Sequence, residues 1–184
     1  MPALAPLAPF APFEPSRHGA VDRSVVVRAA RDDDTGAILA VAATRGRQPA
    51  DGRLEAWLAD PSRFVVVAER GAGDVVGWAM VGPWPGEGAQ EGPHVSALTV
   101  HPEHRRCGVG DRMLGALEDW SWRRSDRLWS VVNARNDASI ALHQRHGFVA
   151  VRRIAHYAGM PFEGGWGMLL RAGRPHAATA EEET

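Results

Sequence analysis

The feature that most limits the fold is an alternation of short apolar runs with amphipathic stretches along most of the chain. Apolar runs rich in β-branched residues predict strands, and apolar residues spaced three and four apart predict helices. Strands are predicted over 24–31, 64–68, 75–81, 95–100, 128–132, 148–154 and 166–170. Helices are predicted after the acidic triplet 32–34, around 54–58, over 109–124 and over 136–146.

This order indicates an α/β fold. The 64–68 and 75–81 runs flank a glycine-containing turn, which is typical of an antiparallel hairpin, whereas later strands alternate with helices. We therefore predict a mixed, mostly antiparallel central sheet of six to seven strands, flanked by about four helices.

Neither end of the chain shows this alternation. Residues 1–24 are rich in proline and alanine, and residues 173–184 are small, polar and acidic. We predict two disordered tails around one domain at 25–172, because neither end has a period that could bury an apolar face. Prolines also interrupt the apolar N-terminal residues too often for a signal peptide or a membrane span.

The composition excludes several classes of function. The formal net charge is −1 and no dense basic stripe is present, so a nucleic-acid partner is not expected. The absence of lysine excludes Schiff-base catalysis and the lysine-dependent loop of NTPases. The single cysteine, Cys107, cannot form an internal disulfide, which favours a cytoplasmic protein. No membrane partner is expected, because no stretch reads as a membrane span.

A glycine loop between the fourth strand and the next helix carries the clearest chemical signal. It reads Arg-Arg-Cys-Gly-Val-Gly over 105–110. Glycines let the backbone approach a ligand, and the N–H groups of a helix N-terminus favour a phosphate, with arginine adding a charged contact. Met113 stands where the dinucleotide fingerprint needs a third glycine. The loop therefore predicts a pyrophosphate site, with an ordinary strand-to-helix turn as the alternative.

Two segments in order resemble the GNAT superfamily of acyl-CoA-dependent N-acetyltransferases. Residues 97–110 resemble its R-x-x-G-x-G coenzyme A motif and preceding strand, and residues 136–148 resemble its N-x-x-[AS]-x-x-L-[YH]-x-x-x-G-F signature. Leu142-His143 and residues 164–166 most resemble the phosphinothricin acetyltransferase branch. The resemblance covers about 25–171 and implies a sheet splayed between the fourth and fifth strands, with acetyl-CoA as cosubstrate.

The resemblance also implies which residues hold that cosubstrate. The pantetheine arm would pair with the fourth strand, and the glycine loop would cradle the pyrophosphate. A backbone N–H near Leu98 would stabilise the developing oxyanion. The implied cofactor residues are Leu98, Thr99, Val100, Arg105, Arg106, Cys107, Gly108, Val109, Gly110, Asp111, Asn136 and Ser139.

Transfer to an amine needs a group that accepts a proton, and a proton donor helps the thiolate to leave. His143 stands where family enzymes place a tyrosine near the sulfur, so we predict it as general acid, with a packing role as the alternative. Phosphinothricin-type enzymes carry a glutamate where this chain has Ala97. His94 and Glu91 are the nearest candidate bases. We predict that Trp84, Tyr157 and Trp166 line the substrate cleft.

These residues predict acetyl transfer to the primary amine of a small molecule by direct attack. A protein N-terminal or lysine acetyltransferase and a non-catalytic acyl-CoA-binding protein are the alternatives, and a homodimer stays open. Arg45 or Arg47 in a closed pocket would favour a carboxylate-bearing amine. No metal is predicted, because no carboxylate or cysteine completes the pair His101 and His104 at usual spacing.

Overall fold

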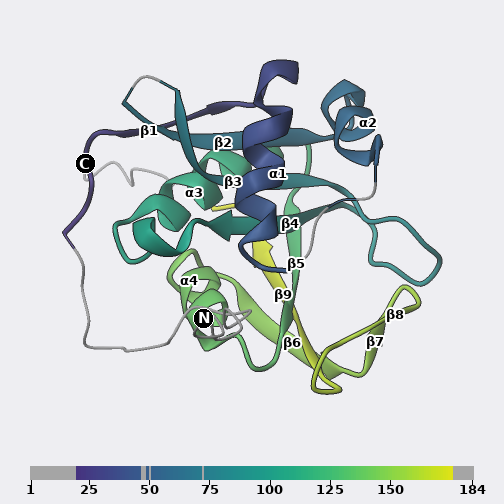
Figure 1. Cartoon of the computed structure of the whole chain (residues 1–184). Helices are drawn as coiled ribbons and strands as arrows, with labels where there is room; N and C mark the ends of the chain where they lie inside the picture. The colour runs from purple at the N-terminus through teal and green to yellow at the C-terminus, as the bar shows by residue number, and fades with distance from the viewer. Residues whose placement is uncertain (1–19, 47–48, 50, 72, 176–184) are drawn as a thin grey trace, which may run out of the picture.

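One mixed sheet and the helices that cover it make up most of the described chain. The computed structural model describes residues 20–46, 49, 51–71 and 73–175 (Figure 1). The main sheet has the order β1-β2-β3-β4-β5-β9-β6, and all neighbours pair antiparallel except β4 and β5. Its strands are β1 (Val25–Ala29), β2 (Phe64–Arg70), β3 (Asp74–Pro83), β4 (Pro93–Val100), β5 (Arg127–Asn133), β6 (Val149–Ile154) and β9 (Gly167–Gly173).

The helices are α1 (Thr35–Ala43), α2 (Arg53–Ala59), α3 (Val109–Ser121) and α4 (Asp137–Arg145), with short 3-10 turns η1 (Asp32–Asp34) and η2 (Pro102–His104).

The predicted fold class is confirmed in its mixed sheet, its strand number and, among the described residues, its four α-helices. One hairpin was not predicted from the sequence, namely β7 (His156–Tyr157) with β8 (Met160–Pro161). Its strands are too short for an apolar period to mark them.

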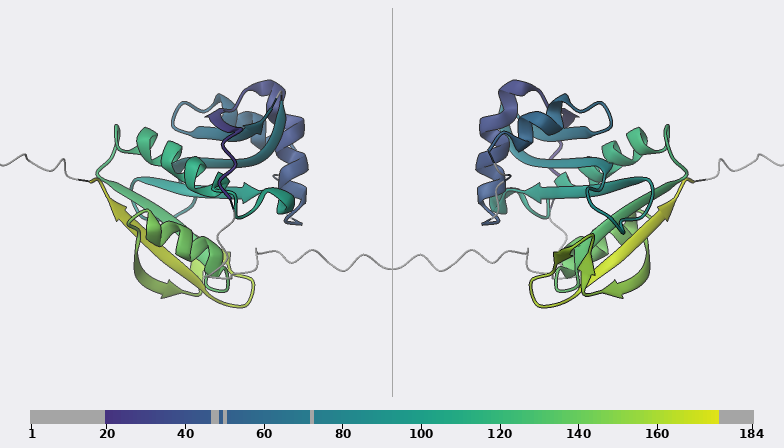
Figure 2. Two further views of the ribbon diagram at one scale, coloured as in Figure 1. Left: turned by 90° about the vertical axis from the view of Figure 1, so that its left-hand side faces the viewer. Right: turned by 90° about the vertical axis from the view of Figure 1, so that its right-hand side faces the viewer.

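Helices cover both faces of the sheet, which explains why its central strands are continuously apolar. Along β2, Val65 and Val67 pack in the cluster beneath α1 and α2. Val66 and Ala68 pack in the opposite cluster with the buried residues of α3. Figure 2 shows the sheet between α1 on one side and α3 on the other. The strand period of two thus divides one apolar run between two cores.

The predicted splay lies between β4 and β5. These strands pair only at His94 with Trp129 and at Val95 with Ser130, and then they diverge (Figure 2). Just past the last pair, Ala97 has a φ of 57° and the register between β3 and β4 shifts. A bulge of this kind bends a strand and releases it from its neighbour. The divergence opens the sheet beside the N-terminal ends of α3 and α4.

The domain's contacts begin before the predicted boundary at residue 25. The backbone N–H of Asp22 donates to the carbonyl of Cys107 at 3.1 Å. The guanidinium of Arg112 donates to the carbonyls of Asp22 and Val25. Residues 1–19 and 176–184 of the predicted tails lie outside the described residues. Within the described part of the chain, no helix has the length and apolar character needed to cross a bilayer.

Candidate active site

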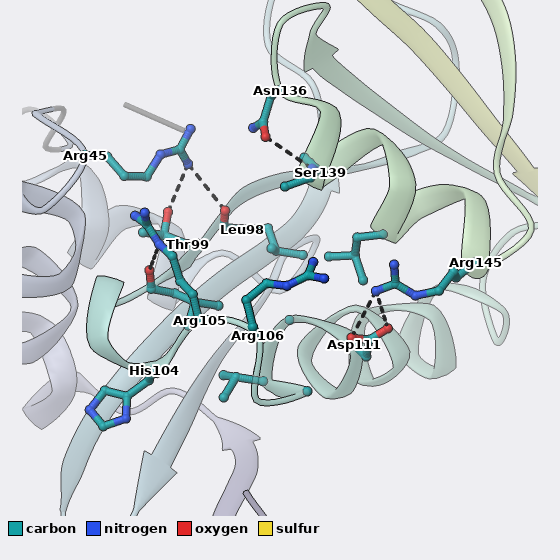
Figure 3. A pocket seen from close by; sticks show the side chains of 16 residues that line it. Arg45, Leu98, Thr99, His104, Arg105, Arg106, Asp111, Asn136, Ser139 and Arg145 are labelled. Carbon is teal, nitrogen blue, oxygen red and sulfur yellow. Dashed lines mark hydrogen bonds and ion pairs between the residues drawn. The ribbon is translucent and has the colours of Figure 1, made fainter. Parts of the chain in front are cut away.

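A cavity lies where β4 leaves β5, and it is bordered by the glycine loop and the first turns of α3 and α4 (Figure 3). All the predicted cofactor residues except Cys107 line it. The sulfur of Cys107 instead donates to the carbonyl of Arg105 at 3.4 Å. The sequence did not single out five further lining residues for this site, namely Arg45, His104, Ala138, Leu142 and Arg145. Leu142 and Arg145 could have been predicted, because they follow Ser139 at intervals of three residues and so lie on the same face of the helix.

The backbone of the glycine loop takes conformations that only particular residues tolerate. Gly108 caps the start of α3 with a φ of 77°, in the left-handed region that strongly favours glycine. Gly110, in the first turn of α3, lies close to α4, and a Cβ added there would be 3.2 Å from Leu142 Cδ2. The two glycines therefore set the turn into α3 and the spacing of the two helices around the cavity.

Four arginines converge on the cavity and make it strongly basic. Arg45, Arg105, Arg106 and Arg145 all line it. The Nε of Arg105 donates to the carbonyl of Val100 at 3.1 Å, and burial lowers the pKa of this guanidinium, although arginine stays charged at neutral pH. A cavity with several guanidinium groups beside a helix N-terminus suits a pyrophosphate.

The edge of β4 that faces the gap forms a second wall. The N–H of His101, just after β4, donates to the Val76 carbonyl at 2.8 Å, and Thr99 pairs with Trp78. Because backbone groups alternate in direction along a strand, those of Leu98 and Val100 face away from β3 and toward the gap. Arg45 Nη1 contacts the Leu98 carbonyl at 3.4 Å and donates to Thr99 Oγ1 at 3.0 Å. Arg45 thus holds this edge in place at the entrance to the gap.

His143 is buried in the wall of the gap, facing a smaller cavity between the diverging strands. Its side chain is 2% exposed, and its Nδ1 lies 2.8 Å from the carbonyl of Ser139. Its Nε2 is buried and has no hydrogen-bond partner among the described residues. Burial lowers the pKa of His143 to about 4. At neutral pH this imidazole is therefore uncharged, which does not support the resting imidazolium that a general acid requires.

A model of the family described as Acetyltransferase (GNAT) matches residues 26–148. The chain belongs to the GNAT acetyltransferase family. The catalytic subunit NAA20 of the N-terminal acetyltransferase B complex from Arabidopsis thaliana is 34% identical over 104 residues, covering 55% of this chain and 59% of that protein. N-alpha-acetyltransferase 20 from Dictyostelium discoideum is 33% identical, over 42% of this chain and 46% of its own length. The chain thus spans about half of these relatives.

Solved structures of GNAT proteins have the same fold. The putative acetyltransferase yncA of Salmonella typhimurium, solved with acetyl-CoA, has a TM-score of 0.69 at 23% identity, covering 87% of this chain and 99% of that one. Ribosomal-protein-alanine N-acetyltransferase from Brucella melitensis has a TM-score of 0.67 at 26% identity, covering 80% and 99%. A putative phosphinothricin N-acetyltransferase has a TM-score of 0.65 at 22% identity, covering 83% and 100%.

Within this GNAT domain, His94 lies in a buried polar network. Its Nδ1 donates to the carbonyl of Gly92 at 3.0 Å, and the hydroxyl of Tyr157 donates to its Nε2 at 2.6 Å. The same hydroxyl accepts from the backbone N–H of Gln90 at 2.9 Å. Burial lowers the pKa of His94 to about 4. Both ring nitrogens are occupied, so the network fastens the loop before β4 to β7 and leaves no nitrogen open to act as a base.

The remaining predicted catalytic and substrate residues also lie outside the two cavities. Trp84 packs edge-on against Tyr157 with ring centroids 5.4 Å apart. Glu91 is exposed, and its backbone carbonyl accepts from Trp129 Nε1 at 3.0 Å. Trp166 is 44% exposed, with the guanidinium of Arg153 4.6 Å from its ring centroid. The structure thus brings Trp84 and Tyr157 together with His94, away from the lining of the gap.

Replacing Tyr157 with phenylalanine is expected to destabilise the domain without weakening coenzyme A binding. The change leaves the buried Nε2 of His94 and the N–H of Gln90 without partners, at a cost of about 2 kcal/mol in the free energy of unfolding. Urea unfolding measures the loss, and calorimetry with coenzyme A measures the affinity. Trp166→Phe, at an exposed ring, is the control. A variant with wild-type stability would contradict the structural role of this network.

A carboxylate cluster joins α3 to α4 beside the cavity. Arg145 Nη2 donates to Asp111 Oδ1 at 2.9 Å, and the Nε2 of His146 lies 3.6 Å from the same oxygen. Nδ1 of His146 donates to Glu118 Oε2 at 2.8 Å. Asp111 and Glu118 raise the pKa of His146 to about 9. Arg145 and His146 therefore offset the negative charge of Asp111, which would otherwise repel a phosphate.

The His146 ion pairs predict a loss of stability at alkaline pH. A folded pKa raised above the unfolded value near 6.5 gives a stabilisation that is complete below pH 6.5 and is lost as pH rises through about 9. The free energy of unfolding should therefore fall between pH 7 and pH 10. His146→Gln should remove most of this fall, and equal pH dependence in the two proteins would show that His146 is not the titrating group.

The structure completes a potential metal-binding set that sequence spacing did not predict. Ligand atoms of His101, Glu103 and His104 lie within 4.8 Å of one another. The 3-10 turn η2 places Glu103 between the two histidines. Sequence spacing did not group Glu103 with these histidines, and its side chain is exposed.

Proposed function

We propose that this protein is an N-acetyltransferase that transfers an acetyl group from acetyl-CoA to the primary amine of a small molecule by direct attack. One observation carries the proposal, namely the basic cavity at the divergence of β4 and β5. There, a strand edge that faces the gap, a glycine loop at a helix N-terminus and a buried histidine whose Nε2 has no hydrogen-bond partner among the described residues lie close together.

The residues around the gap fit acetyl-CoA. Arg105, Arg106 and the N–H groups at the start of α3 would hold the pyrophosphate. The outward backbone N–H groups of Leu98 and Val100 would pair with the pantetheine arm, because the carbonyls of these residues already accept from Arg45 and Arg105. Asn136, whose side chain accepts from the Ser139 N–H at 3.2 Å, caps the neighbouring helix at the cavity. When bound, the thioester supplies an acetyl group activated for attack by an amine.

A protein N-terminus is the second candidate acceptor. The observation in its favour is that relatives 33–34% identical over 42–55% of this chain are named as an N-terminal acetyltransferase subunit and an N-alpha-acetyltransferase. Apart from Arg45, the cavity between the strands is lined by uncharged groups such as Ser96 and Asn133. No carboxylate lines it among the described residues, so polycationic acceptors are not favoured.

A thiol-release assay with acetyl-CoA separates these candidates. The acceptors are free amino acids and simple primary amines on one side, and peptides with free N-termini but no lysine on the other. Faster thiol release with small amines is expected. Thiol release with the peptides and not with the small amines would instead identify a protein N-terminus as the acceptor. Tight acetyl-CoA binding without thiol release for any acceptor would indicate a non-catalytic acyl-CoA-binding protein.

A further inference from the structure

We propose that the 3-10 turn η2 and the residue before it form a binding site for a divalent transition-metal ion such as Zn²⁺. The ligands are one imidazole nitrogen each from His101 and His104 and a carboxylate oxygen from Glu103. The site is independent of the proposed acetyltransferase function, because no step of the acetyl transfer uses the ion.

The sequence His-Pro-Glu-His over 101–104 forms the turn that brings the ligands together. Pro102 occupies the first position of η2, where its fixed φ suits a helical turn and its missing N–H leaves no bond unmade. In a 3-10 turn, side chains three residues apart approach each other. His101 and His104 have this spacing, and their ring centroids lie 5.8 Å apart.

Backbone hydrogen bonds hold the turn in place. The N–H of His101 donates to the carbonyl of Val76 in β3 at 2.8 Å, and the N–H of His104 donates to the carbonyl of His101 at 2.9 Å. Arg105, the next residue, donates through its Nε to the carbonyl of Val100 at 3.1 Å. The backbone that carries the three ligands is therefore fixed to the sheet, and only side chains must move to bind an ion.

The three ligands have the chemistry and the spacing of a transition-metal site. Imidazole nitrogens suit Zn²⁺, Ni²⁺ and Cu²⁺, whereas Mg²⁺ prefers oxygen ligands. One ligand atom from each of the three residues lies within 4.8 Å of the other two. Around a tetrahedral ion with bonds of about 2.0–2.1 Å, ligand atoms are roughly 3.4 Å apart. Small side-chain rotations can close the remaining distance.

The three side chains have no competing partners in the described part of the chain. None of them has a hydrogen bond or an ion pair there, and Nδ1 of His101 is buried without a partner. Buried polar atoms nearly always have a partner, and an ion bound to this nitrogen would supply the missing one. The His101 and His104 side chains are half-buried and that of Glu103 is exposed, so an ion can reach the set from solvent.

Other histidines in the described ranges are less suited to a metal ion. Both ring nitrogens of His94 are hydrogen-bonded within the protein. The ring of His146 lies between the carboxylates of Asp111 and Glu118, and that of His143 is 2% exposed. No other group of three metal-ligating side chains comes together among the residues that the structure describes. Specific binding of one ion at η2 is therefore expected.

The site lies at the edge of the basic cavity. His104 lines the cavity, and its imidazole points away from Arg106 (Figure 3). The guanidinium groups of Arg105 and Arg106 disfavour a cation nearby, and the carboxylate of Glu103 offsets part of their charge. We therefore expect moderate affinity, with a Kd for Zn²⁺ on the order of micromolar.

Calorimetric titration of the full-length protein with ZnCl₂ at pH 7.5, without chelator, tests the site. His104→Gln and Glu103→Gln should each weaken the tightest binding at least about 10-fold, since loss of a residue that only orients a metal ligand already costs about 10–100-fold. His156→Gln changes an exposed histidine outside the set and is the matched control. It should bind Zn²⁺ like the wild type, and MgCl₂ should give no comparable binding.

Long-range ¹H–¹⁵N NMR identifies the ligands independently of affinity. The imidazole signals that vanish in His101→Gln and in His104→Gln should shift when Zn²⁺ is added to the wild type. They should not shift with Mg²⁺. The Zn²⁺-dependent shifts should be lost at pH 5.5, because a ligating imidazole must be neutral and protons compete with the metal.

Three results would overturn the proposal. The first is the absence of Zn²⁺ binding up to about 1 mM. The second is unchanged affinity in both His104→Gln and Glu103→Gln, which would place the ion elsewhere. The third is equal binding of Mg²⁺ and Zn²⁺, which would indicate oxygen ligands alone. The thiol-release assay tests the proposed function separately, because none of these measurements depends on turnover.

Discussion

Gly108→Trp is expected to abolish coenzyme A binding while the domain stays folded. The residue starts α3 with a φ of 77°, and an added Cβ would meet only the Val21 side chain at 3.4 Å, so the backbone has room. The cost is the left-handed strain of about 1–2 kcal/mol. Gly108 itself lines the basic cavity, so a bulky side chain at this position is expected to hinder a phosphate that must approach the backbone there. We expect Kd to rise at least about 100-fold by calorimetry, or about 2.8 kcal/mol.

Gly147→Trp is the matched control for this strain. Gly147 has a φ of 76°, nothing lies within 4 Å of an added Cβ, and it does not line the cavity. The control should lose similar stability and keep its affinity for coenzyme A. Unchanged affinity in a folded Gly108→Trp protein would refute the assignment of the cofactor site.

Removing residues 1–24 is expected to be far more damaging than removing residues 1–19. The longer deletion removes the Asp22 carbonyl that accepts from Arg112 and the N–H that donates to Cys107, next to the glycine loop. Lost hydrogen bonds and a partly unsatisfied guanidinium cost about 3 kcal/mol in the free energy of unfolding. For a domain of this size we expect a fall in Tm of roughly 6–12 °C and weaker coenzyme A binding.

Asp22→Asn distinguishes the backbone contacts of this segment from its ion pair. The carboxylate of Asp22 lies 3.2 Å from Arg70 Nε at an exposed position, and such pairs contribute about 0–1 kcal/mol. The asparagine variant should therefore melt close to the wild type. Equal melting temperatures for the two truncated proteins would show that the Asp22 contacts do not stabilise the domain.

Local patterns in the sequence determined the elements of this fold and the place of its basic cavity. Strand and helix periods depend on neighbours along the chain, so each element of the main sheet could be predicted, including the turn from β4 through Gly108 into α3. The cavity follows from the same local order, because the motif residues from Leu98 to Asp111 lie on one strand, one loop and one helix. Residues that line the cavity from consecutive elements were therefore found.

Roles that depend on partners distant in the sequence were decided only by the tertiary structure. The tautomer of His143 comes from its own helix, but its burial comes from Phe148 and the splayed strands. His94 is unavailable as a base because Tyr157, 63 residues away, occupies its Nε2. A side chain's charge and open atoms depend on the groups packed around it. No local pattern records those groups, because they meet only when the sheet is assembled.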